Sequence, residues 1–152
     1  SGIIIQRSSA LYRTEPVGMR AQASYLNAVL LARVSFAPAR LLLLLKRMER
    51  RSGRRSGRHW GPRPLDLDIV DFAGRVCGWP PSRRLRGQLV LPHPEAHRRA
   101  FVLVPLIDVM PAWRHPVLGQ SARALLERTG TQRRGVKRIL DSGWISCQEI
   151  TT

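Results

Sequence analysis

The sequence predicts an α+β fold, in which helices pack on a mainly antiparallel sheet. Two observations lead to this class. Short apolar segments of strand length are bounded by proline and glycine, and they are mixed along the chain with segments of helical length. The 152 residues are about one domain long, and 43% of them are hydrophobic. That content is enough to bury a core, and it argues against intrinsic disorder.

The first two elements are expected to be strands. Residues 3–13 are predicted to form a strand that ends at a turn, where Pro16 and Gly18 interrupt the chain. Residues 24–36 are predicted to form a second strand, which is mostly buried because apolar residues dominate it. Both strands therefore belong to the sheet on which the helices pack.

A helix is expected next. Pro38 suits the first turn of a helix, and Gly53 can cap its end. Five consecutive leucines, residues 41–45, lie inside this helix, and we assign them to the core. Glycine and proline then break residues 53–64 into a loop.

The second half is expected to contain further strands and helices. Residues 65–72 give the clearest strand pattern, because apolar residues alternate there with Asp66 and Asp68. The remaining predictions are a short strand over 88–92, one or two short helices within 93–111, and a helix over 121–128. Residues 130–152 are expected to be a C-terminal tail of unknown role, whose apolar alternation could occupy a vacant edge of the sheet.

The charge balance points to polyanionic partners. The formal net charge is +16 and the pI is about 11.8, which favours nucleic acid, a nucleotide or an acidic surface. Most of the cations are arginines, whose planar side chains fork around phosphate oxygens. A genome rich in G and C would produce the same enrichment without any function, so charge alone does not decide between these partners.

Cysteine usage and hydropathy predict a cytoplasmic protein without a membrane segment. Cys77 and Cys147 are too few and too far apart for a disulfide framework or a metal cluster, so we expect two thiols in a reducing compartment. The longest apolar run is the five leucines, far below the ~20 residues of a membrane span. The three isoleucines near the start are too few for the apolar region of a signal peptide.

Asp66 and Asp68 are the candidate metal ligands. Two positions apart on a strand, their side chains would leave one face about 7 Å from each other. Carboxylates at that spacing can share two Mg²⁺ ions, which lie about 4 Å apart in two-metal sites. An ordinary amphipathic strand with its acids in water would show the same alternation, so the neighbouring residues must decide.

The residues before the aspartate pair are strongly basic. Positions 46–63 hold eight lysines and arginines against one acid, Glu49. A helix end followed by an arginine loop broken by glycines can enclose phosphates, because each guanidinium makes charge-assisted hydrogen bonds. A Mg²⁺ pair beside such a loop would neutralise charge during phosphoryl transfer. A solvated basic face remains the alternative, but it gives no reason for the placement of the acids.

Aromatic and amide side chains elsewhere could bind a flat heterocycle. Tyr25 and Asn27 lie two positions apart on one predicted strand, and Phe101 follows the basic pair at positions 98 and 99. Stacking on aromatic rings together with an amide that reads the ring edge is a common way to hold such a ligand. Each aromatic residue could equally be part of the core, and His93 could be a phosphate donor or a surface imidazole.

Four sequence blocks resemble a known family in their order and separation. They are "SALYRTEPVG", "YLNAV", "GRRSGRHWGPRPLDLDIV" and "LPHPEAHRRAFVLVPL". Together they are similar to 6-hydroxymethyl-7,8-dihydropterin pyrophosphokinases, enzymes of the folate pathway, over about residues 5–128. The segment Trp-Gly-Pro-Arg followed by Asp-Leu-Asp is the most specific of these features.

The resemblance implies a ferredoxin-like fold and transfer of pyrophosphate from ATP to the hydroxymethyl group of the pterin. It implies two Mg²⁺ ions at Asp66 and Asp68. The implied pterin-binding residues are Thr14, Pro16, Val17, Tyr25, Asn27, Trp60 and Phe101. The implied ATP-binding residues are Arg54, Arg55, Trp60, Arg63, Ile69, His93 and Arg99. Of these, the implied catalytic residues are Arg54, Arg55 and Arg63.

The sequence departs from the family pattern in three places. Ser56 stands where the second arginine of the loop is usual, so Arg55 is expected to replace it, and His59 stands where another arginine is usual. The family's first strand, which ends in Gly-Ser-Asn, and the helix after it have no counterpart. We therefore expect residues 1–129 to form an N-terminally truncated pyrophosphokinase domain whose sheet lacks the first strand.

Two other functions are compatible with the same residues. The first is a weak or inactive truncated homologue, which the missing strand suggests. The second is a basic module that binds nucleic acid, which rests on net charge alone. The nucleic-acid hypothesis ranks last, because the arginines are not interleaved with aromatic residues in a known binding motif. We expect a monomer whose partners are ATP and the pterin.

Overall fold

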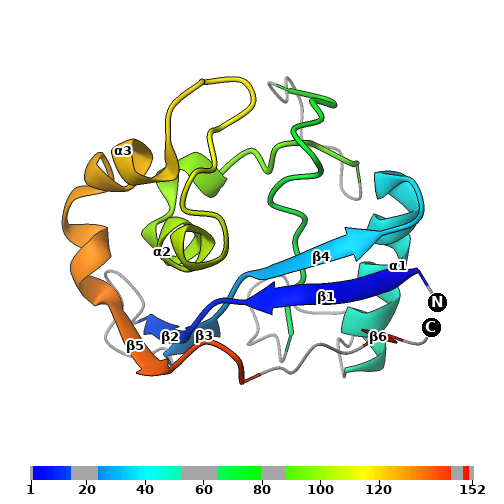
Figure 1. The fold of residues 1–152 in the computed structure, drawn as a ribbon, viewed down its shortest axis with the longest axis horizontal. Coiled ribbons are helices and arrows are strands. Elements are labelled where there is room, and N and C mark those ends of the chain that lie inside the picture. The colour runs from blue at the N-terminus through cyan, green and yellow to red at the C-terminus, as the bar shows by residue number, and fades with distance from the viewer. Residues whose placement is uncertain (1, 15–23, 53–64, 80–87, 145–148, 151–152) are drawn as a thin grey trace. The chain divides into compact units, whose positions relative to one another are not determined.

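The computed structural model describes residues 2–14, 24–52, 65–79, 88–144 and 149–150 (Figure 1). The chain divides into two compact units. The first unit consists of Ser1–Ser35 and Glu95–Thr152, and the second of Phe36–Pro94. Antiparallel strands and helices are both present, which confirms the predicted α+β class.

The first unit contains two antiparallel sheets of three strands each. Their orders are β4-β1-β6 and β3-β2-β5. The strands are β1 (Ile3–Ser8), β2 (Leu11–Thr14), β3 (Tyr25–Asn27), β4 (Leu30–Val34), β5 (Val136–Leu140) and β6 (Glu149–Ile150). Two of these strands come from the C-terminal tail, because β5 pairs with β2 and β6 pairs with β1. The tail therefore adds a strand to each of the two sheets.

Each of the two long strands predicted near the N-terminus is divided into two. The prediction of one continuous strand over 3–13 and another over 24–36 is wrong. The first segment is interrupted near Ser9 and the second near Val29. The Ser9 backbone N–H donates to the Val29 carbonyl at 2.9 Å, and the Val29 N–H donates to Ser9 Oγ, also at 2.9 Å. A side-chain oxygen thus takes a donor that a continuous ladder would have used, and the two sheets separate there.

The helices of the first unit confirm the predicted positions. The region 93–111 forms η1 (Ala96–Arg98) and α2 (Ala100–Val109), and the region 121–128 forms α3 (Ala122–Glu127). The Ser121 hydroxyl caps α3 by accepting from the Ala124 N–H at 3.2 Å. A short helix, η2 (Gly130–Gly135), then leads into β5. The core of this unit is apolar and includes Ile3, Ile5, Ala100, Leu103, Leu106, Val109, Trp113 and Leu125.

The second unit begins with helix α1 (Pro38–Arg51). Proline stands in its first turn as predicted, but the helix is capped by Ser52, whose N–H donates to the Met48 carbonyl at 3.0 Å, before the expected Gly53. The assignment of all five leucines to the core is wrong. Leu41 is buried, whereas Leu43 is 62% exposed. Successive helical residues point about 100° apart, so a run of five must reach the solvent side.

The two strands predicted in the second unit do not form. Residues 65–71, here called the aspartate segment, and residues 88–90 have no ladder partner among the described residues. An isolated antiparallel bridge pairs Cys77 with Leu91, just after these two regions, with backbone N–O distances of 2.8 and 2.9 Å. Side-chain exposure still alternates over residues 65–69 of the aspartate segment. Asp66 and Asp68 are both exposed, although the predicted strand does not form.

Gly78 is required beside this bridge, and we expect Gly78→Ala to lower the free energy of unfolding. Its φ is +64°, and a Cβ there would lie 3.1 Å from the Leu89 carbonyl oxygen. The left-handed backbone alone costs an alanine about 1–2 kcal/mol, and the short contact adds to it. Gly74→Ala is the control, since Gly74 has φ +70° but nothing within 4 Å. Urea denaturation should show the larger loss for Gly78→Ala, and equal losses would contradict the role of the contact.

Candidate active site

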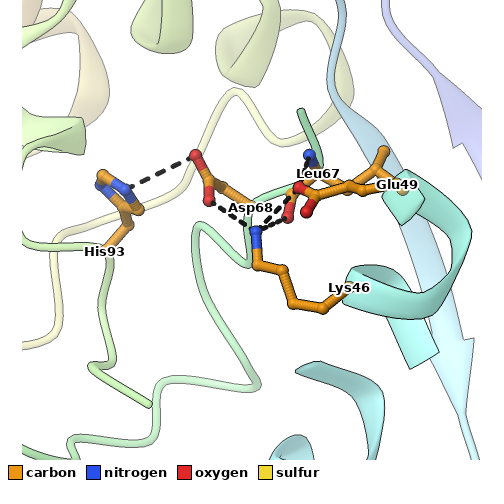
Figure 2. A network of polar contacts seen from close by, with 5 residues as sticks. All are labelled: Lys46, Glu49, Leu67, Asp68 and His93. Atoms are coloured by element: carbon orange, nitrogen blue, oxygen red, sulfur yellow. Dashed lines mark hydrogen bonds and ion pairs between the residues drawn. The ribbon is translucent and has the colours of Figure 1, made fainter. Parts of the chain in front are cut away.

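Helix α1 presents a buried acid to the aspartate segment. Glu49 is 0% exposed. Its Oε1 accepts from Lys46 Nζ at 2.8 Å and from the Leu67 backbone N–H at 2.8 Å (Figure 2). Glu49 lies eight residues, or about two turns, after the buried Leu41, so it falls on the inward stripe of the helix. A carboxylate in that position needs paired charge and hydrogen bonds, and both are present.

Lys46 and His93 flank the second aspartate. Lys46 Nζ lies 3.2 Å from the Leu67 carbonyl oxygen and 3.8 Å from Asp68 Oδ1. On the other side, His93 Nε2 lies 3.7 Å from Asp68 Oδ2 (Figure 2). The backbone of His93 is fixed to the same segment, because its N–H donates to the Val70 carbonyl at 2.9 Å. Asp68 itself remains 46% exposed, so its carboxylate is open to a ligand.

Three carboxyl groups lie close together around the Leu67 peptide, and their ionisation is linked. Burial, the negative charge of Asp68 and a hydrogen bond to Glu49 raise the pKa of Asp66, against the opposing effect of Lys46. Burial also opposes ionisation of Glu49, but hydrogen bonds from Leu67 and Lys46 hold its pKa below the ordinary value. The cluster therefore favours added positive charge near Asp66.

The first unit holds the described residues that the resemblance assigned to the pterin. Strand β3 places Tyr25 opposite Thr14 of β2, and the Asn27 Nδ2 donates to Thr14 Oγ1 at 2.8 Å. Tyr25 is 48% exposed. Phe101 lies in the first turn of helix α2 and is half-buried. The two-residue spacing thus places Tyr25 and Asn27 on one short strand, as predicted.

Arg99 and Ile69, assigned to ATP, also fall within the described residues. The Arg99 guanidinium lies over the Phe101 ring, 5.7 Å from its centroid, in a cation–π arrangement. Ile69 is half-buried in the aspartate segment. The other assigned residues lie outside the described part of the chain: Pro16, Val17, Arg54, Arg55, Trp60 and Arg63.

Lys46 and Glu49 were missed as site residues by the sequence analysis. Lys46 was counted only as one of the eight cations of positions 46–63, and Glu49 only as the single acid there. The signal that could have found them is the spacing of Leu41, Leu45 and Glu49 at every fourth position, which puts an acid on the buried stripe of α1. An acid in that position calls for a nearby partner.

The described residues contain at most small clusters of side chains that could bind a metal ion. Within residues 2–14, 24–52, 65–79, 88–144 and 149–150, no three or more His, Cys, Asp or Glu side chains are arranged to hold a metal ion. The aspartate pair offers two carboxylates. This suits Mg²⁺, which usually takes one or two carboxylates and completes its six ligands with water and substrate phosphates. Over the same residues, no helix is both long and apolar enough to cross a membrane.

Comparison with protein families identifies the group to which these residues belong. The family of 7,8-dihydro-6-hydroxymethylpterin-pyrophosphokinases matches residues 2–111. The chain belongs to this family. The matched range includes helix α1, the aspartate segment, His93 and the start of helix α2. Residues 112–152, which hold α3, β5 and β6, follow the matched range.

Individual pyrophosphokinases show how much of the family's length is present. A 2-amino-4-hydroxy-6-hydroxymethyldihydropteridine pyrophosphokinase of Synechocystis is 36% identical over 128 residues, which are 84% of this chain and 62% of the relative. The Bacillus subtilis pyrophosphokinase is 35% identical over 72% of this chain and 61% of its own length. A mitochondrial folate synthesis bifunctional protein of Arabidopsis thaliana is 41% identical over 72% of this chain and 18% of its own length. The chain thus spans about three fifths of the two pyrophosphokinases.

Proposed function

We propose that this chain transfers pyrophosphate from ATP to the hydroxymethyl oxygen of 6-hydroxymethyl-7,8-dihydropterin. One observation carries the proposal: Asp66 and Asp68 are both exposed, two positions apart, directly after the most basic part of a family member. In this reaction the hydroxymethyl oxygen bonds to the β-phosphorus of ATP. The bond from that phosphorus to the α,β-bridging oxygen breaks, the hydroxyl proton goes to solvent, and AMP leaves.

Asp66 and Asp68 are proposed to hold two Mg²⁺ ions. The residues fit such ions because the donors are hard oxygen atoms and because burial and the neighbouring negative charge of Asp68 raise the pKa of Asp66, which a bound cation would oppose. Bound Mg²⁺ would neutralise charge that develops on the phosphates during transfer. His93, 3.7 Å from Asp68, is placed to orient that carboxylate or to donate to a phosphate oxygen.

The remaining roles follow the family pattern. Arg54, Arg55 and Arg63 are proposed to bind the phosphates through charge-assisted hydrogen bonds, with Trp60 and Arg99 on the nucleotide side. Tyr25 and Phe101 are proposed to stack on the pterin ring, and Asn27 is proposed to hydrogen-bond to the edge of the ring. No covalent intermediate is needed, since positioning and charge neutralisation supply the rate enhancement in phosphoryl transfer. We also propose that the protein acts as a monomer in the cytoplasm.

Formation of AMP tests this function directly. The protein is incubated with ATP, Mg²⁺ and 6-hydroxymethyl-7,8-dihydropterin, and AMP is followed by chromatography. We expect AMP to appear only with the pterin present and in equal amount to the pterin diphosphate. ADP and phosphate released without the pterin would instead indicate an ordinary ATPase. Absence of AMP at high protein concentration would favour the inactive homologue.

A further inference from the structure

The Leu67 peptide, between the two aspartates, is held by side chains of helix α1. Its N–H donates to Glu49 Oε1 at 2.8 Å, and its carbonyl oxygen accepts from Lys46 Nζ at 3.2 Å (Figure 2). Backbone polar groups must find partners, and in a strand a neighbouring strand supplies them. The aspartate segment has no ladder partner within the described residues. Two side chains therefore fill the place of a strand neighbour at this residue.

The two side chains also stabilise each other. Lys46 Nζ lies 2.8 Å from Glu49 Oε1, and the residues are three positions apart on one helix. A fully buried carboxylate is tolerated only when its charge is paired and hydrogen-bonded. The lysine and the Leu67 N–H meet both needs of Glu49. The pair is consequently fixed before any ligand arrives.

Holding the backbone N–H and carbonyl of Leu67 constrains both neighbouring residues. The Cα atoms of Asp66 and Asp68 are bonded to the two peptide units that meet at Leu67, so rotation about this backbone would change the separation of their carboxylates. Contacts to the N–H and the carbonyl oxygen of Leu67 oppose that rotation from two directions. Residues that orient metal ligands without touching the metal commonly contribute about 10–100-fold to metal affinity.

We propose that Glu49 and Lys46 are positioning residues, which clamp the Leu67 peptide and thereby fix Asp66 and Asp68 for divalent cations. The inference rests on the proposed function, because it assumes that the aspartates bind those cations. It goes beyond that function by assigning roles to two side chains of α1. The clamp acts through the peptide, so neither side chain needs to contact the cation.

Binding of Mn²⁺ separates the clamp from a simple effect of charge. The affinity is measured by electron paramagnetic resonance with a non-hydrolysable ATP analogue in wild type, Glu49→Gln, Glu49→Ala and Lys46→Met. The clamp predicts about a tenfold loss for Glu49→Ala and a smaller loss for Glu49→Gln, whose amide oxygen can still accept from Leu67. A pure charge effect predicts equal losses for these two. It also predicts tighter binding for Lys46→Met, whereas the clamp predicts weaker binding.

Arg47→Met is the matched control for the lysine variant. Arg47 is the next residue on α1, is exposed, and carries the same charge. We expect its Mn²⁺ affinity to stay within about twofold of wild type, as a surface charge screened by salt has little effect. Thermal denaturation of every variant checks that the fold persists. If Glu49→Ala does not fold, Glu49→Gln and Lys46→Met still decide between the two explanations.

Hydrogen exchange of the Leu67 amide tests the clamp without any metal. In wild type we expect slow exchange by NMR, and in Glu49→Ala we expect exchange at least about tenfold faster, with Glu49→Gln between them. Unchanged exchange and unchanged Mn²⁺ affinity in the variants would overturn the clamp while leaving the proposed function intact. Absence of Mn²⁺ binding by wild type would instead overturn the proposed metal site, and the role of the clamp with it.

Discussion

Replacement of either aspartate, as Asp66→Asn or Asp68→Asn, should lower pterin-dependent AMP formation by about a thousandfold. That factor corresponds to about 4 kcal/mol of lost transition-state stabilisation. Each substitution removes one anionic oxygen donor and leaves side-chain volume nearly unchanged. The loss should appear mainly in kcat, because charge on the transferred phosphates is neutralised most strongly in the transition state. Steady-state assays at saturating Mg²⁺ and ATP measure it.

The same substitutions should leave the fold intact. Burial and the Asp68 charge raise the pKa of Asp66, so its ionised form is disfavoured in the folded chain. A neutral amide relieves that repulsion, and the melting temperature of Asp66→Asn should equal or exceed that of wild type. Asp71→Asn is the control, since its side chain accepts from the Gly74 N–H at 3.1 Å and an amide oxygen can do the same. Full activity in Asp66→Asn, or equal loss in Asp71→Asn, would exclude the metal role.

Features set by local chemistry could be predicted from the sequence. Pro38 in a first turn is a property of a few adjacent residues, and helix α1 begins where it indicates. The helix predicted over 121–128 is α3, which Ser121 caps. Strands require partners from elsewhere in the chain. The break at Ser9 depends on Val29, twenty residues away, and the aspartate segment has the alternation of a strand without a described neighbour to pair with. Alternation records which face is exposed, but it cannot report whether a ladder forms.

The candidate site was also predicted only in part from the sequence. The aspartate pair was found because two acids in a basic chain are conspicuous. Glu49 was not, since its charge was counted without its four-residue spacing from Leu45 and Leu41, which places it on the buried stripe. One acid among eight cations suggests an exposed charged surface. In the helix, however, Glu49 lies on the same buried side as Leu41. The partners that make this burial possible, Lys46 and the Leu67 peptide, come from two separate elements.

Alkaline pH should destabilise the first unit through Tyr12. This residue of β2 is 6% exposed, and its hydroxyl donates to Asp108 Oδ2 at 2.8 Å. The same oxygen accepts from the Ala10 N–H at 3.1 Å. Burial first, and then the hydrogen bond and charge of Asp108, raise the pKa of Tyr12 to about 12, against the opposing charge of Arg138. The ordinary value, which the unfolded chain should show, is 10.0.

The sign of the effect follows from this difference. Between pH 10 and pH 12 the unfolded chain has lost the phenol proton while the folded chain retains it. The contribution of Tyr12 is therefore complete below pH 10 and is lost as the pH rises to 12. A change of two pKa units corresponds to about 3 kcal/mol. Urea denaturation at a series of pH values should show this fall in the free energy of unfolding.

Comparison with Tyr12→Phe isolates the phenol from the other groups of the chain that respond to alkali. The variant should be less stable than wild type at pH 8, because Asp108 loses a donor, yet its stability should fall less between pH 10 and 12. Tyr25→Phe is the control, since it removes a phenol that is 48% exposed, and its curve should run parallel to that of wild type. Parallel curves for wild type and Tyr12→Phe would show that the buried phenol does not set the alkaline limit.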